Sequence, residues 1–440
     1  MKKLDKDIYH VGGSAALVFT KSPRFAKAEV AMEKNADDGE FSLWGDDNLY
    51  PQRFLAKFNR TDAAVGGIEV LTTAHYGNGF KLFKEKNKGD SIVQEQQLLS
   101  DFPEIKSFFS KVKFPKMLTG IIADFEVFRL AFPEYLLSPN GDKIISVKRH
   151  RTAWCRFGVP DKSGYVRKVF INSDWETANA DITVSVDLIP DEFASADEIK
   201  EYAKSRKLKS FILPVTSNLM TEKLYPAVGW HSSFNNGWVD TVLSVPEFKL
   251  SMFINQLNMK YLVYVSDEFM VRRYGAEDWE SISAAEREMK REELARKIDD
   301  HMSGNKAAGR SLTSPYFRDN NGQMIKGIEV VPVDDKIKDG NFLPDAAAGN
   351  SQILFAMAVD PSLIGAGIPG GKNLSGSGSD KREAYTILCS KMPYKRICTT
   401  EIFNIIRDYN GWDADLIGNF PNQNLTTLDK NPAGVKEIIL

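Results

Sequence analysis

The sequence has few cysteines, scattered histidines and almost no net charge. Its 440 residues include three cysteines, none in a CxxC pair, and an odd count without a framework argues against a disulfide scaffold or a structural zinc site and favours a reducing compartment. Lysine and arginine number 57 against 59 acids, so the formal charge is −2. A protein this close to neutrality has no global basic field with which to grip nucleic acid through many phosphates.

Long apolar runs are absent as well. No stretch of about 18 consecutive apolar residues occurs, so we expect no transmembrane helix. The run at 15–19 is too short for the apolar part of a signal peptide, so no secretion signal is expected either. Hydrophobic residues at 42% and aromatic residues at 11% are values of a folded globular chain. At roughly 150 residues per domain, the length predicts more than one compact core.

Helical and extended segments are mixed along the chain, which predicts an α+β fold. We expect an irregular arm over 1–40 and a small antiparallel sheet between Pro133 and about Ile189. Apolar periodicity predicts helices over 105–130, 197–207, 236–261, 279–302, 344–360 and 380–409. Prolines interrupt or bend three of them, at Pro115, Pro246 and Pro393. Residues 262–333 form a predicted β-α-β-β module between two helices.

One internal stretch is strongly basic. Between Lys143 and Lys168 the chain carries eight lysines or arginines and a single acid, Asp161. Such a run is typical of a solvated sheet face, and a phosphate-binding patch is the alternative interpretation.

The most unusual stretch is 365–379, in which six of fifteen residues are glycine. Gly365, Gly367 and Gly370 match G-x-G-x-x-G, but that dinucleotide motif needs a strand before it and a helix directly after it, and here a helix is predicted before it. Gly371-Lys372 resembles part of a P-loop whose magnesium-binding hydroxyl is replaced by Asn373. A nucleotide-dependent enzyme that uses Gly365–Lys372 is kept as the alternative hypothesis. The simplest interpretation of the stretch is a flexible surface loop.

No catalytic arrangement emerges from the spacing of reactive residues. The five histidines are far apart and include no H-E-x-x-H pair, so each is expected to be a surface or packing residue. Ser377 lacks the glycine two residues earlier that a nucleophile elbow requires. We expect no catalytic residue, no metal site and no cofactor site, and hence no enzyme.

Several segments, taken together, resemble the portal proteins of tailed double-stranded-DNA bacteriophages. Residues 356–365, Ala-Met-Ala-Val-Asp-Pro-Ser-Leu-Ile-Gly, resemble the Val-Pro-Pro-x-Leu-Leu-Gly-like turn that ends a stem helix in that family. The glycine-rich 366–379 then stands where the family has its tunnel loop, and 379–383 where its next helix begins. Segments 44–51, 77–80 and 225–226 are similar to its wing region and its approach to the stem. Two departures are Asp360, where many members have a small or apolar residue, and a short C-terminal crown.

The resemblance implies a non-enzymatic ring, typically of twelve copies, at one capsid vertex, through which DNA is packaged and later ejected. It implies this division of the chain: arm 1–40, wing 41–235, first stem helix 236–261, clip 262–339, second stem helix 340–361, tunnel loop 362–379, helix behind the loop 380–408 and crown 409–440. The residues implied to face DNA are Gly367, Gly370, Gly371, Lys372, Asn373, Ser375, Ser377, Lys381 and Arg382.

The implied partners are further copies of the chain, double-stranded DNA held in sliding contact, a large terminase that carries the ATP site, a head–tail adaptor and a major capsid or scaffold protein, with no membrane. The implied location is the virion, after assembly in the cytoplasm of a bacterial host. A non-viral scaffold protein, with the glycine-rich segment as a linker, is the remaining alternative.

Overall fold

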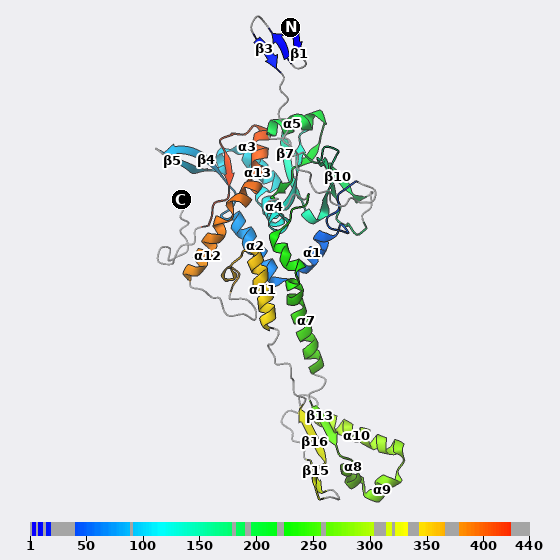
Figure 1. Ribbon diagram of the computed structural model, residues 1–440. Helices are drawn as coiled ribbons and strands as arrows, with labels where there is room; N and C mark the ends of the chain where they lie inside the picture. Colours follow the sequence, from blue (N-terminus) through cyan, green and yellow to red (C-terminus); the bar gives the residue numbers. More distant parts are fainter. Residues whose placement is uncertain are drawn as a thin grey trace. The chain divides into compact units, whose positions relative to one another are not determined.

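The computed structural model describes residues 2–5, 8–11, 15–18, 40–88, 91–177, 182–189, 195–217, 224–256, 261–302, 314–318, 322–332, 343–365 and 378–423. The chain divides into two compact units, one made of Met1–Val242 with Ala346–Leu440 and one of Leu243–Asp345. Both contain helices and strands, which agrees with the predicted mixture (Figure 1). None of the described helices is long and apolar enough to cross a bilayer.

The predicted arm contains a small sheet. Strands β1 (Lys2–Asp5), β2 (Ile8–Val11) and β3 (Ala15–Val18) pair antiparallel in that order. Their spacing agrees with the short extended pieces expected over 1–40.

The first unit is built around the helix α4 (Phe114–Phe128). The helical pattern over 105–130 was expected to be interrupted at Pro115, and the structure interrupts it at Lys113, between α3 (Pro103–Val112) and α4. Lys113 adopts the left-handed conformation, with φ of 52°, and Pro115 stands in the first turn of α4, where its missing N–H costs no hydrogen bond. Other described helices that lie entirely in this unit are α1 (Tyr50–Phe58), α2 (Asp62–Tyr76), α5 (Ala196–Ser205), α6 (Ser232–Asn235), α12 (Gly378–Ser390) and α13 (Pro393–Asn410). The start of α7 (Trp238–Gln256) and most of α11 (Leu343–Met357) belong to it as well.

The single antiparallel sheet expected over 133–189 is in fact two sheets. In one, β6 (Leu130–Leu137) is the central strand and pairs with β7 (Ile144–His150), β11 (Ser210–Ile212) and β12 (Val215–Thr216). In the other, β8 (Cys155–Phe157), β9 (Lys168–Ile171) and β10 (Val184–Asp187) pair in chain order. A third sheet joins β4 (Lys81–Lys88), β5 (Ser91–Gln97) and β17 (Ile417–Asn419), so the C-terminal strand closes onto the N-terminal half.

The core of the first unit lies where α4 packs against α2, α3, α13 and the β6–β7 sheet. One face of α4 is completely inaccessible to solvent at Phe114, Leu118, Ile121, Ile122 and Phe125. These side chains share one cluster with Tyr135 of β6 and Phe403 of α13. Burial of apolar surface on this scale is the main favourable contribution to folding.

Within the described part of 262–333, the second unit contains three helices where the sequence predicted one. Its elements are the later part of α7 (Trp238–Gln256), β13 (Tyr261–Val265), α8 (Asp267–Tyr274), α9 (Ala276–Ser281), α10 (Ala284–Met302), β14 (Tyr316–Arg318), β15 (Met324–Lys326) and β16 (Ile328–Pro332). The predicted helix over 279–302 breaks between α9 and α10 because Ser283 and Glu286 form reciprocal side-chain to backbone hydrogen bonds of 3.3 and 3.0 Å. Strand β13 pairs antiparallel with β16, and β14 with β15.

Two long helices stand on either side of this unit in the chain. The helix predicted over 236–261 is shorter, since α7 ends at Gln256 and Tyr261 already belongs to β13, and Pro246 lies inside α7 as expected. The helix α11 (Leu343–Met357) follows, close to the predicted 344–360. The helix predicted over 380–409 is divided into α12 and α13, because Pro393 opens a new helix instead of bending one.

Candidate functional site

The described residues hold only the two ends of the glycine-rich segment. Of the residues predicted to face DNA, Gly367, Gly370, Gly371, Lys372, Asn373, Ser375 and Ser377 lie outside the described residues. Lys381 and Arg382 are described, and they lie near the N-terminal end of α12. The described elements next to the segment are α11 with the short helix after it at one end and α12 at the other.

The first end follows directly from α11. After Met357 the chain turns at Ala358, whose φ of 54° is left-handed, and Val359 and Ala358 donate to the carbonyls of Leu354 and Phe355 at 3.0 Å. These two bonds end the helix. The short helix η5 (Pro361–Leu363) then begins with Asp360 as its cap, whose Oδ1 accepts from the backbone N–H of Ser362 at 2.8 Å. Asp360, a departure from the portal pattern, thus has a local structural role.

Two glycines of α2 make room for this end. A Cβ built on Gly67 would come within 2.7 Å of the Met357 side chain, and one on Gly66 within 3.2 Å of Ile364. A larger residue at position 67 would require the end of the Met357 side chain to move.

The second end begins at α12, which contacts both α2 and η5. The two ends of the glycine-rich segment are therefore held close together against α2 (Figure 1). Lys381 is exposed and Arg382 is half-buried. What precedes Gly365 is helical, in α11 and η5, whereas the nucleotide hypothesis requires a strand there.

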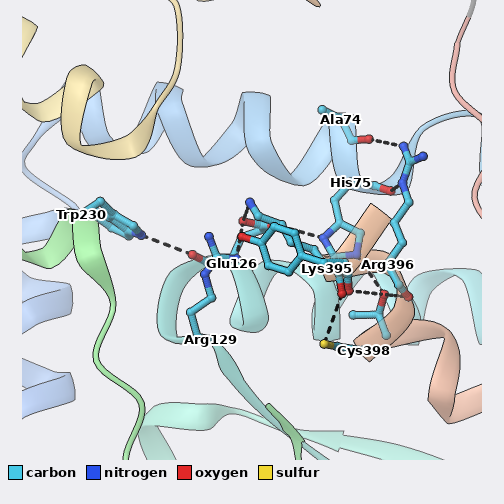
Figure 2. A network of polar contacts seen from close by, with 10 residues as sticks. Ala74, His75, Glu126, Arg129, Trp230, Lys395, Arg396 and Cys398 are labelled. Atoms are coloured by element: carbon cyan, nitrogen blue, oxygen red, sulfur yellow. Dashed lines mark hydrogen bonds and ion pairs between the residues drawn. The ribbon is translucent and has the colours of Figure 1, made fainter. Parts of the chain in front are cut away.

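A buried ionic network connects side chains of α2, α4 and α13 (Figure 2). Its centre is Glu126 of α4, with no solvent exposure. One carboxylate oxygen, Oε2, accepts from Lys395 Nζ at 2.7 Å and from Arg129 Nη1 at 2.9 Å. The other, Oε1, lies 2.8 Å from Nδ1 of His75, and Nε2 of that ring lies 2.9 Å from the Thr399 hydroxyl. The network joins α2, α4 and α13.

The network sets the protonation of its members. Burial alone opposes ionisation of Glu126, but the hydrogen bond from His75 and the charges of Lys395 and Arg129 outweigh it and lower the pKa of Glu126 to about 2. Burial also lowers the pKa of His75. An ionised carboxylate only accepts, so a neutral His75 carries its proton on Nδ1 and accepts from Thr399 at Nε2.

Arg396, next to Lys395 on α13, caps the end of α2. Its guanidinium donates to the carbonyl oxygens of Ala74 at 2.7 Å and His75 at 3.0 Å (Figure 2). It also donates to Asn422 Oδ1 at 2.7 Å. A cation at the C-terminal end of a helix also interacts favourably with the helix dipole.

The network was not predicted, although the sequence held a signal for it. Asp124 and Glu126 are acids inside the otherwise apolar stretch 121–128, and both are buried. Asp124 accepts from Arg149 at both oxygens, each at 2.7 Å. His75 was expected to be a packing residue, and it is buried as such, but it also orients this carboxylate.

Part of the basic run at 143–168 is engaged with acids or with backbone carbonyl oxygens. Lys143 pairs with Glu104 at 2.6 Å, Arg149 with Asp124, and Arg167 with Asp161 at 2.9 Å. Arg156 is fully buried and donates to Asn48, Ala153 and Cys155 carbonyl oxygens. Half of the eight cations are therefore engaged, which weakens the interpretation of this run as a phosphate-binding patch.

No cluster of three or more histidine, cysteine or acidic side chains that could hold a metal ion occurs within the described ranges. No protein-family model matches the sequence, and no curated protein matches it either.

Solved structures do resemble the fold, at low sequence identity. A chain in the virion of a native gene transfer agent particle matches with a TM-score of 0.56 and 14% identity, over 89% of this chain and 87% of that one. A chain in the neck of the native particle, computed with C12 symmetry, matches with a TM-score of 0.55 and 14% identity over 90% of each chain. One in the neck of the empty particle, computed with C6 symmetry, also has a TM-score of 0.55 at 14% identity, over 89% and 87%. The chain therefore shares its fold with a component of gene transfer agent particles.

Proposed function

We propose that this chain is a portal protein, the subunit of a ring at one vertex of a phage-type capsid through which double-stranded DNA is packaged and later ejected. The observation that carries the proposal is the fold similarity, which extends over nine-tenths of this chain and nine-tenths of a chain in a particle neck of C12 symmetry. The turn at 356–365 and the glycine-rich segment after it support the same assignment from the sequence.

The order of elements agrees with a division into wing, stem and clip. In the proposal the wing is 41–235, the stem helices are 236–261 and 340–361, and the clip is 262–339. The tunnel loop is 362–379, the helix behind it 380–408 and the crown 409–440. Helices α7 and α11 precede and follow a separate compact unit in the chain, as this division requires.

Exposed apolar side chains on three helices of the first unit support assembly into a ring. Phe355 of α11 is 81% exposed, Ile397 of α13 is 68% exposed and Ile387 of α12 is 58% exposed. Contact with a partner would remove such side chains from water, which is favourable. In the proposal the partner is a further copy of the chain.

The charge distribution suits DNA that slides through the ring. Each lysine or arginine held on a phosphate releases counterions and adds adhesion, so a near-neutral chain grips weakly. Lys381 and Arg382 would supply a few positive contacts next to the loop. A large terminase would supply the ATP-driven motor, a head–tail adaptor and a capsid or scaffold protein would bind the ring, and the ring would become part of the virion after assembly in the host cytoplasm.

The decisive experiment images the purified full-length protein and measures the mass of its oligomer. Negative-stain microscopy is expected to reveal rings with a central hole, and native mass spectrometry a closed oligomer, typically of twelve copies. A monomer at every concentration and salt condition would contradict the proposal.

Deletion of 366–378 tests the role of the loop. Rings are expected to assemble, while packaging or retention of DNA in particles is lost. The matched control replaces the same residues by a glycine–serine segment of equal length, which keeps the loop's length and freedom. If the deletion unfolds the chain while the control folds, the segment is structural instead.

A further inference from the structure

We infer that a basic cavity in the first unit binds a phosphate group. The cavity has a volume of about 220 Å³. It lies where the end of α11, the link between α12 and α13, and the segment 227–230 meet. The inference does not depend on the chain being a portal protein.

Three cations line this cavity: Arg129, Lys391 and Lys395. Arg129 and Lys395 both donate to the same carboxylate oxygen, Oε2 of Glu126, which is buried and does not line the cavity. No aspartate or glutamate is among the lining residues. Lys391 is exposed and forms no ion pair within the part of the chain that the structure describes. Three cations therefore face one carboxylate, which leaves an excess of positive charge at the cavity.

The protonation of Lys395 reflects this excess. Its pKa is lowered, first by burial and also by repulsion from Arg129 and Lys391, despite the attraction of Glu126. An anion in the cavity would relieve the repulsion. The cavity also lies beside the N-terminal end of α13, which begins at Pro393 without a side-chain cap, and the helix dipole adds positive potential there.

The volume of the cavity limits the size of the ligand that it can hold. Pockets for drug-sized molecules have volumes of roughly 300–1,000 Å³, so this one is too small for a whole nucleotide and suits a single phosphate group. Arginine and lysine together are the usual donors to phosphate oxygens. Trp230, Met357 and Leu388 add apolar groups to the wall of the cavity.

In the test, the full-length chain is titrated with inorganic phosphate, and isothermal titration calorimetry measures the heat of binding. Phosphate replaces chloride so that the ionic strength stays constant. Saturable binding is expected. Lys391→Gln is expected to weaken it about tenfold, the share of one charged hydrogen bond, and Lys391→Arg to retain most of it. The control is Lys116→Gln, on an exposed lysine of α4 outside the cavity, which should bind as the native chain does. Because Lys391 is exposed, its substitution should leave folding intact.

Two further titrations identify the source of the phosphate. Duplex DNA with and without a 5′-phosphate is added in competition with inorganic phosphate. Competition only by the phosphorylated duplex supports a terminal phosphate, competition by both supports backbone phosphate, and competition by neither supports the free ion. The assignment is overturned if inorganic phosphate does not saturate, or if Lys391→Gln binds it as tightly as the native chain.

Discussion

The two compact units differ in how much core holds them together. In the first unit, 28 buried apolar side chains form one cluster around α4, with the Glu126 network beside it. Among the described residues of the second, the corresponding cluster has five buried members, Met270, Trp279, Leu294, Ile298 and Ile328. Small cores leave little stability after the loss of chain entropy. We therefore expect the second unit to unfold first.

Charge does not compensate for the small core of the second unit. Helix α10 carries ion pairs between Glu293 and Lys297 and between Glu292 and Arg296, but all four side chains are more than half exposed. Exposed pairs contribute little to stability because solvent and salt screen them. In the first unit, by contrast, Glu126 and Lys395 are buried, so loss of either partner leaves a charge without compensation.

The largest effect is expected from Glu126→Gln. The substitution leaves Lys395 and Arg129 buried without their carboxylate, and the free energy of unfolding of the first unit should fall by about 3–5 kcal/mol. Urea unfolding, with amide hydrogen exchange in α4 as the local probe, measures it. Glu293→Gln in α10, which breaks an exposed pair, is the control and should leave the midpoint unchanged. Equal behaviour of the two variants would contradict the contrast between the units.

Leu294→Ala tests the small core. Leu294 is 7% exposed in the second unit, and its truncation should cost roughly 2–5 kcal/mol. Hydrogen exchange should then accelerate in β13 and β16 but not in α4. Met289→Ala on the same helix, where the side chain is 63% exposed, should have almost no effect. Acceleration in α4 as well would mean that the two units unfold together.

Acid should destabilise the first unit through His231. Its Nε2–H donates to the Val127 carbonyl at 2.9 Å, so Nδ1 accepts from the Tyr50 hydroxyl at 2.8 Å. Burial lowers the pKa of His231 to about 3. The unfolded chain takes up this proton below pH about 6.5 and the folded one only near pH 3, so stability falls as pH drops through that window.

By pH 5 the share of His231 in this loss is about 2 kcal/mol. His231→Gln removes that share, and its urea midpoint should change less between pH 7 and pH 5 than that of the native chain. His75, whose pKa is also lowered, adds to the loss in both proteins. Parallel pH profiles would show that His231 does not contribute.

The smallest effect is a gain, from Ala358→Gly. Ala358 has φ of 54°, which costs an L residue with a Cβ roughly 1 kcal/mol, and glycine relieves this strain. A small rise in the thermal midpoint of the first unit is expected. Ala348→Gly, at an exposed helical position of the same α11, should instead lower stability by about 1 kcal/mol. A decrease for both variants would contradict the strain at Ala358.

Much of the element order followed from local signals. The alternation of turns and β-branched residues predicted strands within 133–189, and the helix predicted from 344 begins at Leu343. The errors occurred where one residue decides between a bend and a break. At Pro393 a bend was predicted and a new helix begins instead, and at Lys113 the break falls two residues before the proline at which an interruption was expected. Periodicity cannot detect such breaks when the apolar face continues beyond them.

The candidate site could be predicted only in part. The glycine-rich segment and its place between two helices were evident from composition, because glycine and proline act locally. The meeting of its two ends against α2 was not, since Gly66 and Gly67 are about 300 positions away in the chain.

The sequence by itself determined the mixture of helix and strand, the near-zero charge and the position of the glycine-rich segment, because propensity and composition are properties of neighbouring residues. Only the tertiary structure decided that Glu126, His75 and Lys395 form one network and that Arg129, Lys391 and Lys395 line one cavity. Their charges interact over a few ångströms, and that distance is set by the packing of α2, α4 and α13, not by spacing along the chain.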